Sequence, residues 1–187
     1  MILTETRIIQ AAEEAKRQRL DESYRNNSMR FDSDQIYDLF ISHSFKDRDI
    51  VIGLSYLFDK AGYRVYIDWI DDSNLDRKNV TQETAKIIRN RIKKSIGLSY
   101  VSTTNSVSSK WCPWELGVGD GMHGKVCILP IMSSPFNGQE YLGLYPYLEY
   151  EKVYNQSRYD FWVCDQKDQN KYQILRDWLK GYALVNH

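Results

Sequence analysis

The feature that most constrains the fold is a regular alternation of short apolar runs with segments of helical periodicity. The apolar runs cover residues 37–41, 63–67, 97–101 and 126–131, and each has the length of a buried strand. Between them, apolar residues recur at intervals of three and four, as on one face of an amphipathic helix. Such an alternation predicts a parallel sheet with right-handed crossovers and helices on both faces.

The segments between these strands carry helix start and stop signals. Asp47 is placed to cap a helix that ends at Gly62. The long polar loop 68–79 precedes a second helix, whose apolar face begins at Val80. A third helix is expected over residues 111–122.

The C-terminal third is less regular. Residues 133–167 are rich in tyrosine, with a fifth strand expected over residues 148–154. Residues 168–183 have the spacing of a last amphipathic helix. The whole pattern predicts an open, flavodoxin-like α/β fold, in which a parallel sheet of about five strands is flanked by helices.

Residues 4–24 form a separate amphipathic segment at the N-terminus. Apolar positions alternate there with charged ones at helical spacing, and the polar residues 26–28 follow. We therefore divide the chain into an N-terminal helical extension, residues 1–34, and a main domain, residues 35–187. The extension can be an arm for dimerisation or partner binding, or a helix that packs on the domain, which is the commoner case.

Charge balance and cysteine content exclude several classes of function. Lys plus Arg and Asp plus Glu number 25 each, whereas a nucleic-acid-binding domain normally carries a basic excess. Three scattered cysteines without a Cys-x-x-Cys pair make neither a disulfide framework nor a zinc or redox motif. No stretch is apolar enough for a transmembrane helix, and the N-terminus lacks the order of a secretory signal. We expect a cytoplasmic protein with no nucleic-acid partner, no membrane partner and no metal.

The topology itself indicates where a ligand would bind. In open α/β sheets, ligands bind at the carboxyl ends of the strands, where the strand order reverses. With the order 2-1-3-4-5, that point lies between the first and third strands, bracketed by the loops 42–47 and 102–110. Four candidate residues then surround one crevice: His43, Phe45, Trp111 and Glu115. His43 can equally be a capping or solvated loop residue.

Glu115 lies one turn into the third expected helix. Ser109 is placed to cap that helix, and Pro113 lies in its first turn, where a missing N–H costs little. Trp111 and Glu115 are four residues apart and share a face. The carboxylate can serve a pocket or complement the helix macrodipole, an effect of about 0.3–1 kcal/mol, and spacing alone favours the second. Cys112 fits a small buried thiol better than a nucleophile, because no base is evident beside it.

Two segments resemble the TIR (Toll/interleukin-1 receptor) family. Residues 37–44 resemble its first strand and loop, and residues 109–116 contain the Trp-Cys-x-x-Glu-Leu signature of its third helix. The second strand ends in Asp68, and the resemblance covers residues 35–131 well. As a stand-alone TIR domain, the chain is similar to the prokaryotic branch, which includes TIR proteins of anti-phage systems such as Thoeris.

The resemblance implies a reaction and a set of site residues. It implies cleavage of NAD, as a substrate and not a cofactor, at the nicotinamide–ribose bond. The products would be nicotinamide and ADP-ribose, a cyclic isomer or a conjugate that serves as a signal in antiviral defence. Glu115 takes the position of the family's catalytic glutamate. The implied substrate-binding residues are Ser42, His43, Ser44, Phe45, Asp68 and Trp111.

The resemblance also implies self-association through TIR–TIR contacts, and it leaves two other functions open. Many members of the family act only as non-catalytic interaction modules, because a fold does not fix a function. Nucleoside deoxyribosyltransferases have a related α/β architecture and also use a glutamate. The loop 68–79 lacks the glycine or proline common in the family, and the N-terminal helix is additional; both bear on assembly and leave Glu115 unaffected.

Overall fold

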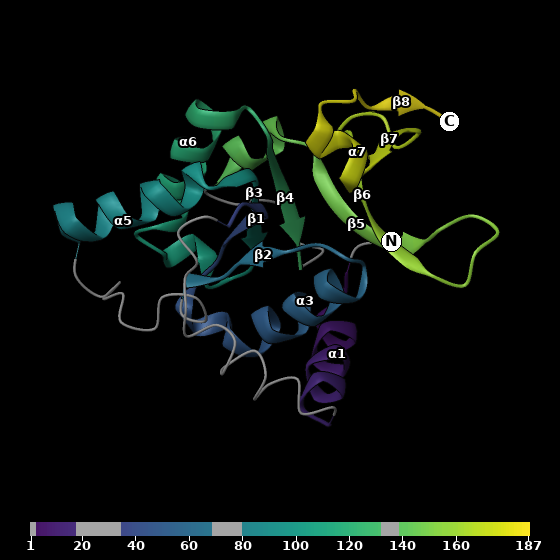
Figure 1. The fold of residues 1–187 in the computed structure, drawn as a ribbon, viewed down its shortest axis with the longest axis horizontal. Helices are drawn as coiled ribbons and strands as arrows, with labels where there is room; N and C mark the ends of the chain where they lie inside the picture. Colours follow the sequence, from purple (N-terminus) through teal and green to yellow (C-terminus); the bar gives the residue numbers. More distant parts are fainter. Residues whose placement is uncertain (1–2, 18–34, 69–79, 132–138) are drawn as a thin grey trace.

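The computed structural model describes residues 3–17, 35–68, 80–131 and 139–187. Their strands form one sheet of eight, in the order β2-β1-β3-β4-β5-β6-β7-β8 (Figure 1). The strands are β1 (Tyr37–Ser42), β2 (Val65–Tyr66), β3 (Ser95–Ser102), β4 (Val126–Pro130), β5 (Tyr147–Lys152), β6 (Tyr159–Cys164), β7 (Lys171–Ile174) and β8 (Val185–Asn186).

The first five strands pair in parallel, which confirms the expected open α/β fold and its 2-1-3-4-5 order. The last three strands extend the sheet in the antiparallel direction. The point where strand order reverses therefore lies between β1 and β3, as the sequence predicted.

Helices cover both faces of the sheet. Helices α1, α3 and α7 contribute to the core on one face, and α5 and α6 to the core on the other (Figure 1). The helices are α1 (Glu5–Arg17), α3 (Arg48–Lys60), α5 (Gln82–Lys93), α6 (Cys112–His123) and α7 (Leu175–Lys180). The 3₁₀ turns within the described ranges are η1 (Phe45–Asp47), η2 (Ser106–Ser108) and η3 (Glu140–Leu144).

The central strands are apolar throughout because both of their faces are buried. In β4, Cys127 and Leu129 pack with α1 and α3, whereas Val126 and Ile128 pack with α5 and α6. A strand covered on both sides needs apolar residues at every position, which is why this segment appeared as one continuous run.

The predicted boundaries shift at two elements. The expected strand 63–67 is paired only over Val65–Tyr66. The second helix begins at Gln82, after Thr81, whose Oγ1 accepts a hydrogen bond from the N–H of Thr84 at 3.1 Å. Val80 therefore lies outside the helix, because the N-cap residue Thr81 marks where the helix begins. Its side chain is exposed.

The prediction of a helix over residues 168–183 was right for only part of that range. Lys171–Ile174 is strand β7, and only Leu175–Lys180 is helical. Tyr172 lies edge-on against Trp162 across the β6–β7 pair, with ring centres 5.6 Å apart. The apolar spacing fitted a helix, but cross-strand pairing with β6 overrides it. Strand β6 itself falls within the segment that was expected to be irregular.

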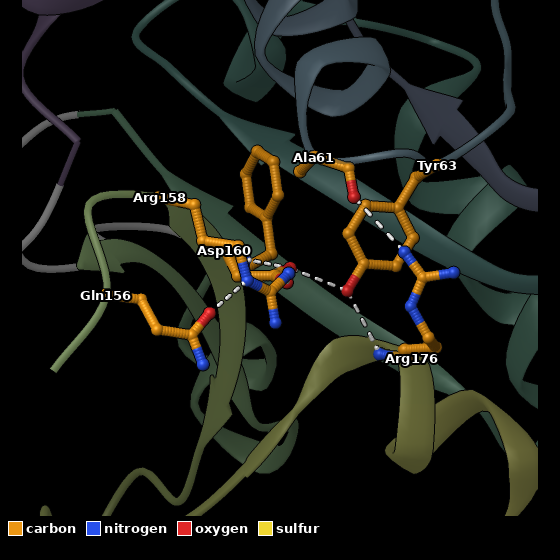
Figure 2. A network of polar contacts seen from close by, with 7 residues as sticks. Ala61, Tyr63, Gln156, Arg158, Asp160 and Arg176 are labelled. Carbon is orange, nitrogen blue, oxygen red and sulfur yellow. Dashed lines mark hydrogen bonds and ion pairs between the residues drawn. The ribbon is translucent and has the colours of Figure 1, made fainter. Parts of the chain in front are cut away.

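A polar network ties these added strands to the end of α3 (Figure 2). Tyr63 Oη donates to Asp160 Oδ1 at 2.7 Å and accepts from the backbone N–H of Arg176 at 3.1 Å. The Arg176 guanidinium donates to the carbonyl of Ala61 at 3.1 Å, and Arg158 pairs with Asp160 Oδ2 at 3.0 Å. Asp160 is fully buried, so these contacts stabilise a charge that would otherwise be costly.

Helix α1 packs directly on α3. A Cβ atom at Gly53 would lie 2.2 Å from the carbonyl oxygen of Ile8, so only glycine allows the two backbones to come this close. Ile8, Ala11 and Ala15 are buried in the same core as α3. Residues 18–24 of the predicted N-terminal helix, and the predicted domain boundary at residue 34, lie outside the described residues.

Candidate active site

Ser109, the predicted cap of helix α6, lies two residues before the N-cap position, which Trp111 occupies without a side-chain cap hydrogen bond. Ser109 Oγ accepts hydrogen bonds from the N–H groups of Trp111 and Cys112 at 3.3 and 3.2 Å. The N–H of Glu115 bonds to the carbonyl of Trp111 at 2.8 Å. Regular α6 geometry begins only at Cys112, but Ser109 supplies the acceptor for the first turn. These hydrogen bonds fix where Glu115 projects from the helix.

Glu115 is fully buried and meets the carboxyl end of β1. Ser42 Oγ donates a hydrogen bond of 2.7 Å to Glu115 Oε2, across 73 positions of sequence. Trp111 is also buried and packs edge-on against Trp114, with ring centres 5.4 Å apart. The carboxylate and the indole thus share the interior side of α6, and the carboxylate has a specific hydrogen-bond donor.

His43 and Asp68 form a second buried pair at the same edge. His43 Nδ1 lies 2.8 Å from the carbonyl oxygen of Ile41, and because a carbonyl only accepts, Nδ1 carries the proton. His43 Nε2 lies 3.3 Å from Asp68 Oδ1, with both side chains almost completely buried. The pair joins the end of β1 to Asp68, two residues after the end of β2.

Asp47 has a role that the sequence did not reveal. It lies at the N-cap position of α3, but its side chain makes no cap hydrogen bond. Its two carboxylate oxygens instead accept from Thr103 Oγ1 at 2.6 Å and from Asn105 Nδ2 at 2.5 Å. Asp47 therefore occupies the predicted N-cap position of α3 but does not make the expected cap hydrogen bond. Its buried carboxylate accepts hydrogen bonds from the loop after β3 instead.

Ser44 and Phe45 do not join the Glu115 cluster. Ser44 is buried and its Oγ accepts from the N–H of Lys46 at 3.4 Å, which caps η1. Phe45 is 58% exposed, with the Arg48 guanidinium 5.6 Å from its ring centre. Of the predicted substrate-binding residues, the structure groups Ser42 with Glu115 and His43 with Asp68, and it leaves Phe45 on the surface.

A cavity of about 230 Å³ lies between the two loops at this edge. Its walls include Lys46 and Asp47 from the first loop and Thr103 and Asn105 from the second, together with Glu5 of α1. Both predicted loops contribute to this cavity, but none of the four residues predicted around one crevice (His43, Phe45, Trp111 and Glu115) is among its described lining residues. Glu115 itself is fully buried.

Tyr100 is a further buried group at this edge. It pairs with Ser42 in the register of β1 and β3, and its Oη lies 3.0 Å from Gln139 Nε2. Burial raises the pKa of Tyr100 to about 12, so the phenol stays neutral at physiological pH. Nothing in the sequence indicated that this tyrosine, which lies inside an apolar strand, would be found at the candidate site.

Within the described ranges, no group of three or more His, Cys, Asp or Glu side chains is arranged to hold a metal ion. In the same part of the chain, no helix is long and apolar enough to cross a membrane.

Known proteins resemble this chain over much of its length. It is 42% identical over 165 residues to a Bacillus cereus (strain MSX-D12) protein named "Probable 3' cyclic ADP-D-ribose synthase ThsB'", with 86% of this chain and 82% of that protein covered. It is 36% identical over 98 residues to "Putative cyclic ADP-D-ribose synthase TIR2" of Cytobacillus dafuensis. That match spans 52% of this chain and only 26% of the longer relative.

The chain belongs to the TIR family. Among solved structures, this TIR protein is similar to the TIR domain of the Toll-related receptor TRR-2 from Hydra magnipapillata, at 25% identity and a TM-score of 0.41. That similarity covers 53% of this chain and 72% of the receptor domain. No family model matches the sequence.

Proposed function

We propose that this TIR protein cleaves NAD at the nicotinamide–ribose bond, with Glu115 as the catalytic carboxylate, and makes an ADP-ribose-derived signal in antiviral defence. The observation that carries the proposal is the position of Glu115. It lies in the first turn of α6, beside the switch point of the sheet, and accepts a hydrogen bond from Ser42. The named activities of the two relatives, both cyclic ADP-D-ribose synthases, support the same chemistry.

One carboxylate is sufficient for this reaction. Ordinary glycosidases need a second carboxyl group to protonate the leaving oxygen. Nicotinamide in NAD is a cationic pyridinium, so it takes the electrons of the broken bond and leaves as a neutral molecule. The ribose carbon then develops positive charge, which an ionised Glu115 stabilises electrostatically. A buried carboxylate does this better than an exposed one, because little water screens it.

Ring closure follows if a hydroxyl group of the same molecule attacks the ribose carbon. The new carbon–oxygen bond forms as the hydroxyl loses its proton, which the Glu115 carboxylate can accept. The product is then a cyclic ADP-ribose, and attack by water would instead give linear ADP-ribose. We favour the cyclic product because the relative that matches 86% of this chain is named a cyclic ADP-D-ribose synthase.

We also propose the substrate, the assembly state and the cell compartment of the enzyme. NAD is the substrate, and the chain needs neither a cofactor nor a metal. The active form self-associates through TIR–TIR contacts, in the cytoplasm. The remaining proposed substrate-site residues are Ser42, His43, Ser44, Phe45, Asp68 and Trp111.

Substitution of the carboxylate tests the proposal. We expect Glu115→Gln to abolish nicotinamide release from NAD, with products identified by mass spectrometry. The matched control is Glu83→Gln, which removes an exposed carboxylate from the first turn of α5. If Glu115 only complements the helix macrodipole, both variants will keep wild-type turnover. That result would reject the catalytic assignment.

A further inference from the structure

A second, larger cavity lies on the face of the sheet opposite α6. It measures about 620 Å³, is open to solvent and is lined by residues of α1, α3 and the β5–β6 hairpin. The residues that define its chemistry are Arg7 and Glu14 of α1, Lys60 of α3, and Tyr150, Arg158 and Tyr159 of the hairpin. Its volume is that of a site for a small organic ligand. None of these residues has a part in the reaction proposed above.

The charge of this cavity is positive. Three of its described lining residues are cations, and Glu14 is the single carboxylate among them. Lys60 Nζ lies 3.7 Å from Glu14 Oε1, and Arg158 pairs with the buried Asp160 (Figure 2). Within the described part of the chain, no carboxylate is paired with Arg7. A cation without a carboxylate partner in a cavity favours an anionic ligand.

The Arg7 guanidinium is held in place by aromatic rings. Its Cζ lies 4.6 Å from the ring centre of Tyr159 and 5.2 Å from that of Tyr150. The two tyrosine rings are themselves stacked, with centres 5.5 Å apart and planes 24° apart. A guanidinium restrained by aromatic rings can still donate N–H groups to an anion. Tyr159 is also 38% exposed, so part of its ring can contact a ligand.

We propose that this cavity binds an organic anion of the nucleotide class. Arg7 and Lys60 bind its phosphate, and Tyr159 stacks on its planar ring. Both features are needed for this assignment, because cations alone would bind any anion and tyrosines alone would bind any flat apolar molecule. The inference is independent of the proposed NAD cleavage.

Calorimetric titration of the wild-type protein with AMP tests the assignment, with inorganic phosphate and adenosine as separate probes. We expect AMP to bind more tightly than either probe. Arg7→Gln and Tyr159→Ala should each weaken AMP binding roughly tenfold, whereas Tyr159→Phe should retain it. The matched control is Lys86→Gln, an exposed cation of α5 on the other face of the sheet. Hydrogen exchange should show protection by AMP in α1 and in the β5–β6 hairpin.

Three results would overturn the proposal: no AMP binding at millimolar concentration, AMP binding that is unchanged in both Arg7→Gln and Tyr159→Ala, or phosphate binding as tight as AMP binding. Thermal melting shows whether each variant is folded. If Arg7→Gln loosens α1, Lys60→Gln on α3 provides an independent removal of charge, and unchanged AMP affinity in that variant would count against the site.

Discussion

Ser42 is the residue that orients the Glu115 carboxylate. Both side chains have no exposed surface, and the hydroxyl donates to Oε2 at 2.7 Å. A buried carboxylate is costly unless hydrogen bonds stabilise it, and a donor on one oxygen also restricts rotation of the group. We therefore assign Ser42 a positioning role in addition to its proposed place at the substrate site.

Loss of this hydroxyl should slow catalysis. We expect Ser42→Ala to lower kcat for nicotinamide release roughly tenfold with little change in KM, because a misoriented carboxylate stabilises the transition state less well. Steady-state kinetics measures this. Ser55→Ala, which removes a buried hydroxyl from α3, is the control. An unchanged kcat in Ser42→Ala would show that the hydrogen bond has no part in turnover.

At the scale of elements, the contact between α1 and α3 depends on one glycine. Gly53 lies where the carbonyl of Ile8 approaches, and α1 buries its apolar face there. The same helix supplies Glu5 and Ile9 to the switch-point cavity and Arg7 to the second cavity. The position of α1 thus shapes two candidate ligand sites.

A methyl group at this contact should displace α1. We expect Gly53→Ala to lower the free energy of unfolding by about 1–3 kcal/mol and to increase hydrogen exchange in Glu5–Arg17. The control is Gly121→Ala in α6, where nothing lies within 4 Å of the added Cβ. That variant should be neutral or stabilised by roughly 0.5–1 kcal/mol. Equal stability of the two variants would mean that α1 does not pack closely on α3 in solution.

At the scale of the whole molecule, the network around Tyr63 joins the parallel part of the sheet to its antiparallel extension (Figure 2). We expect Tyr63→Phe to lower the free energy of unfolding by about 1–3 kcal/mol, because buried Asp160 loses a hydrogen-bond donor. Urea denaturation measures this, with Tyr182→Phe at an exposed position as control. Equal losses in the two variants would show that the network does not stabilise the fold.

Buried acidic groups should make the molecule sensitive to alkali. Burial raises the pKa of Cys127 from 9.0 to about 12 and that of Tyr100 from 10.0 to about 12. Both groups ionise in the unfolded chain before they ionise in the folded one, so their contribution is complete below pH 9 and is lost as pH rises towards 12. The urea midpoint should therefore fall between pH 9 and 11. A constant midpoint over this range would contradict the burial of these groups.

Much of the parallel core could be predicted because its strands are covered on both faces. The apolar runs at 37–41, 97–101 and 126–131 all became strands, and the strand order followed from right-handed crossovers. The C-terminal third could not be predicted equally well. At Lys171–Ile174, the apolar spacing suited a helix, and pairing with β6 converted the segment into a strand.

In the candidate site, too, some features could be predicted from local sequence and others could not. Local sequence was sufficient to place Glu115 in the first turn of the helix that follows Ser109, because capping and helical spacing involve residues only a few positions apart. Long-range packing supplied the hydrogen-bond donor that the carboxylate meets. Ser42 reaches it across 73 positions, and Asp47 bonds to Asn105 across 58. Such pairs form only when the folded sheet brings the ends of β1 and β3 together, so no local pattern specifies them.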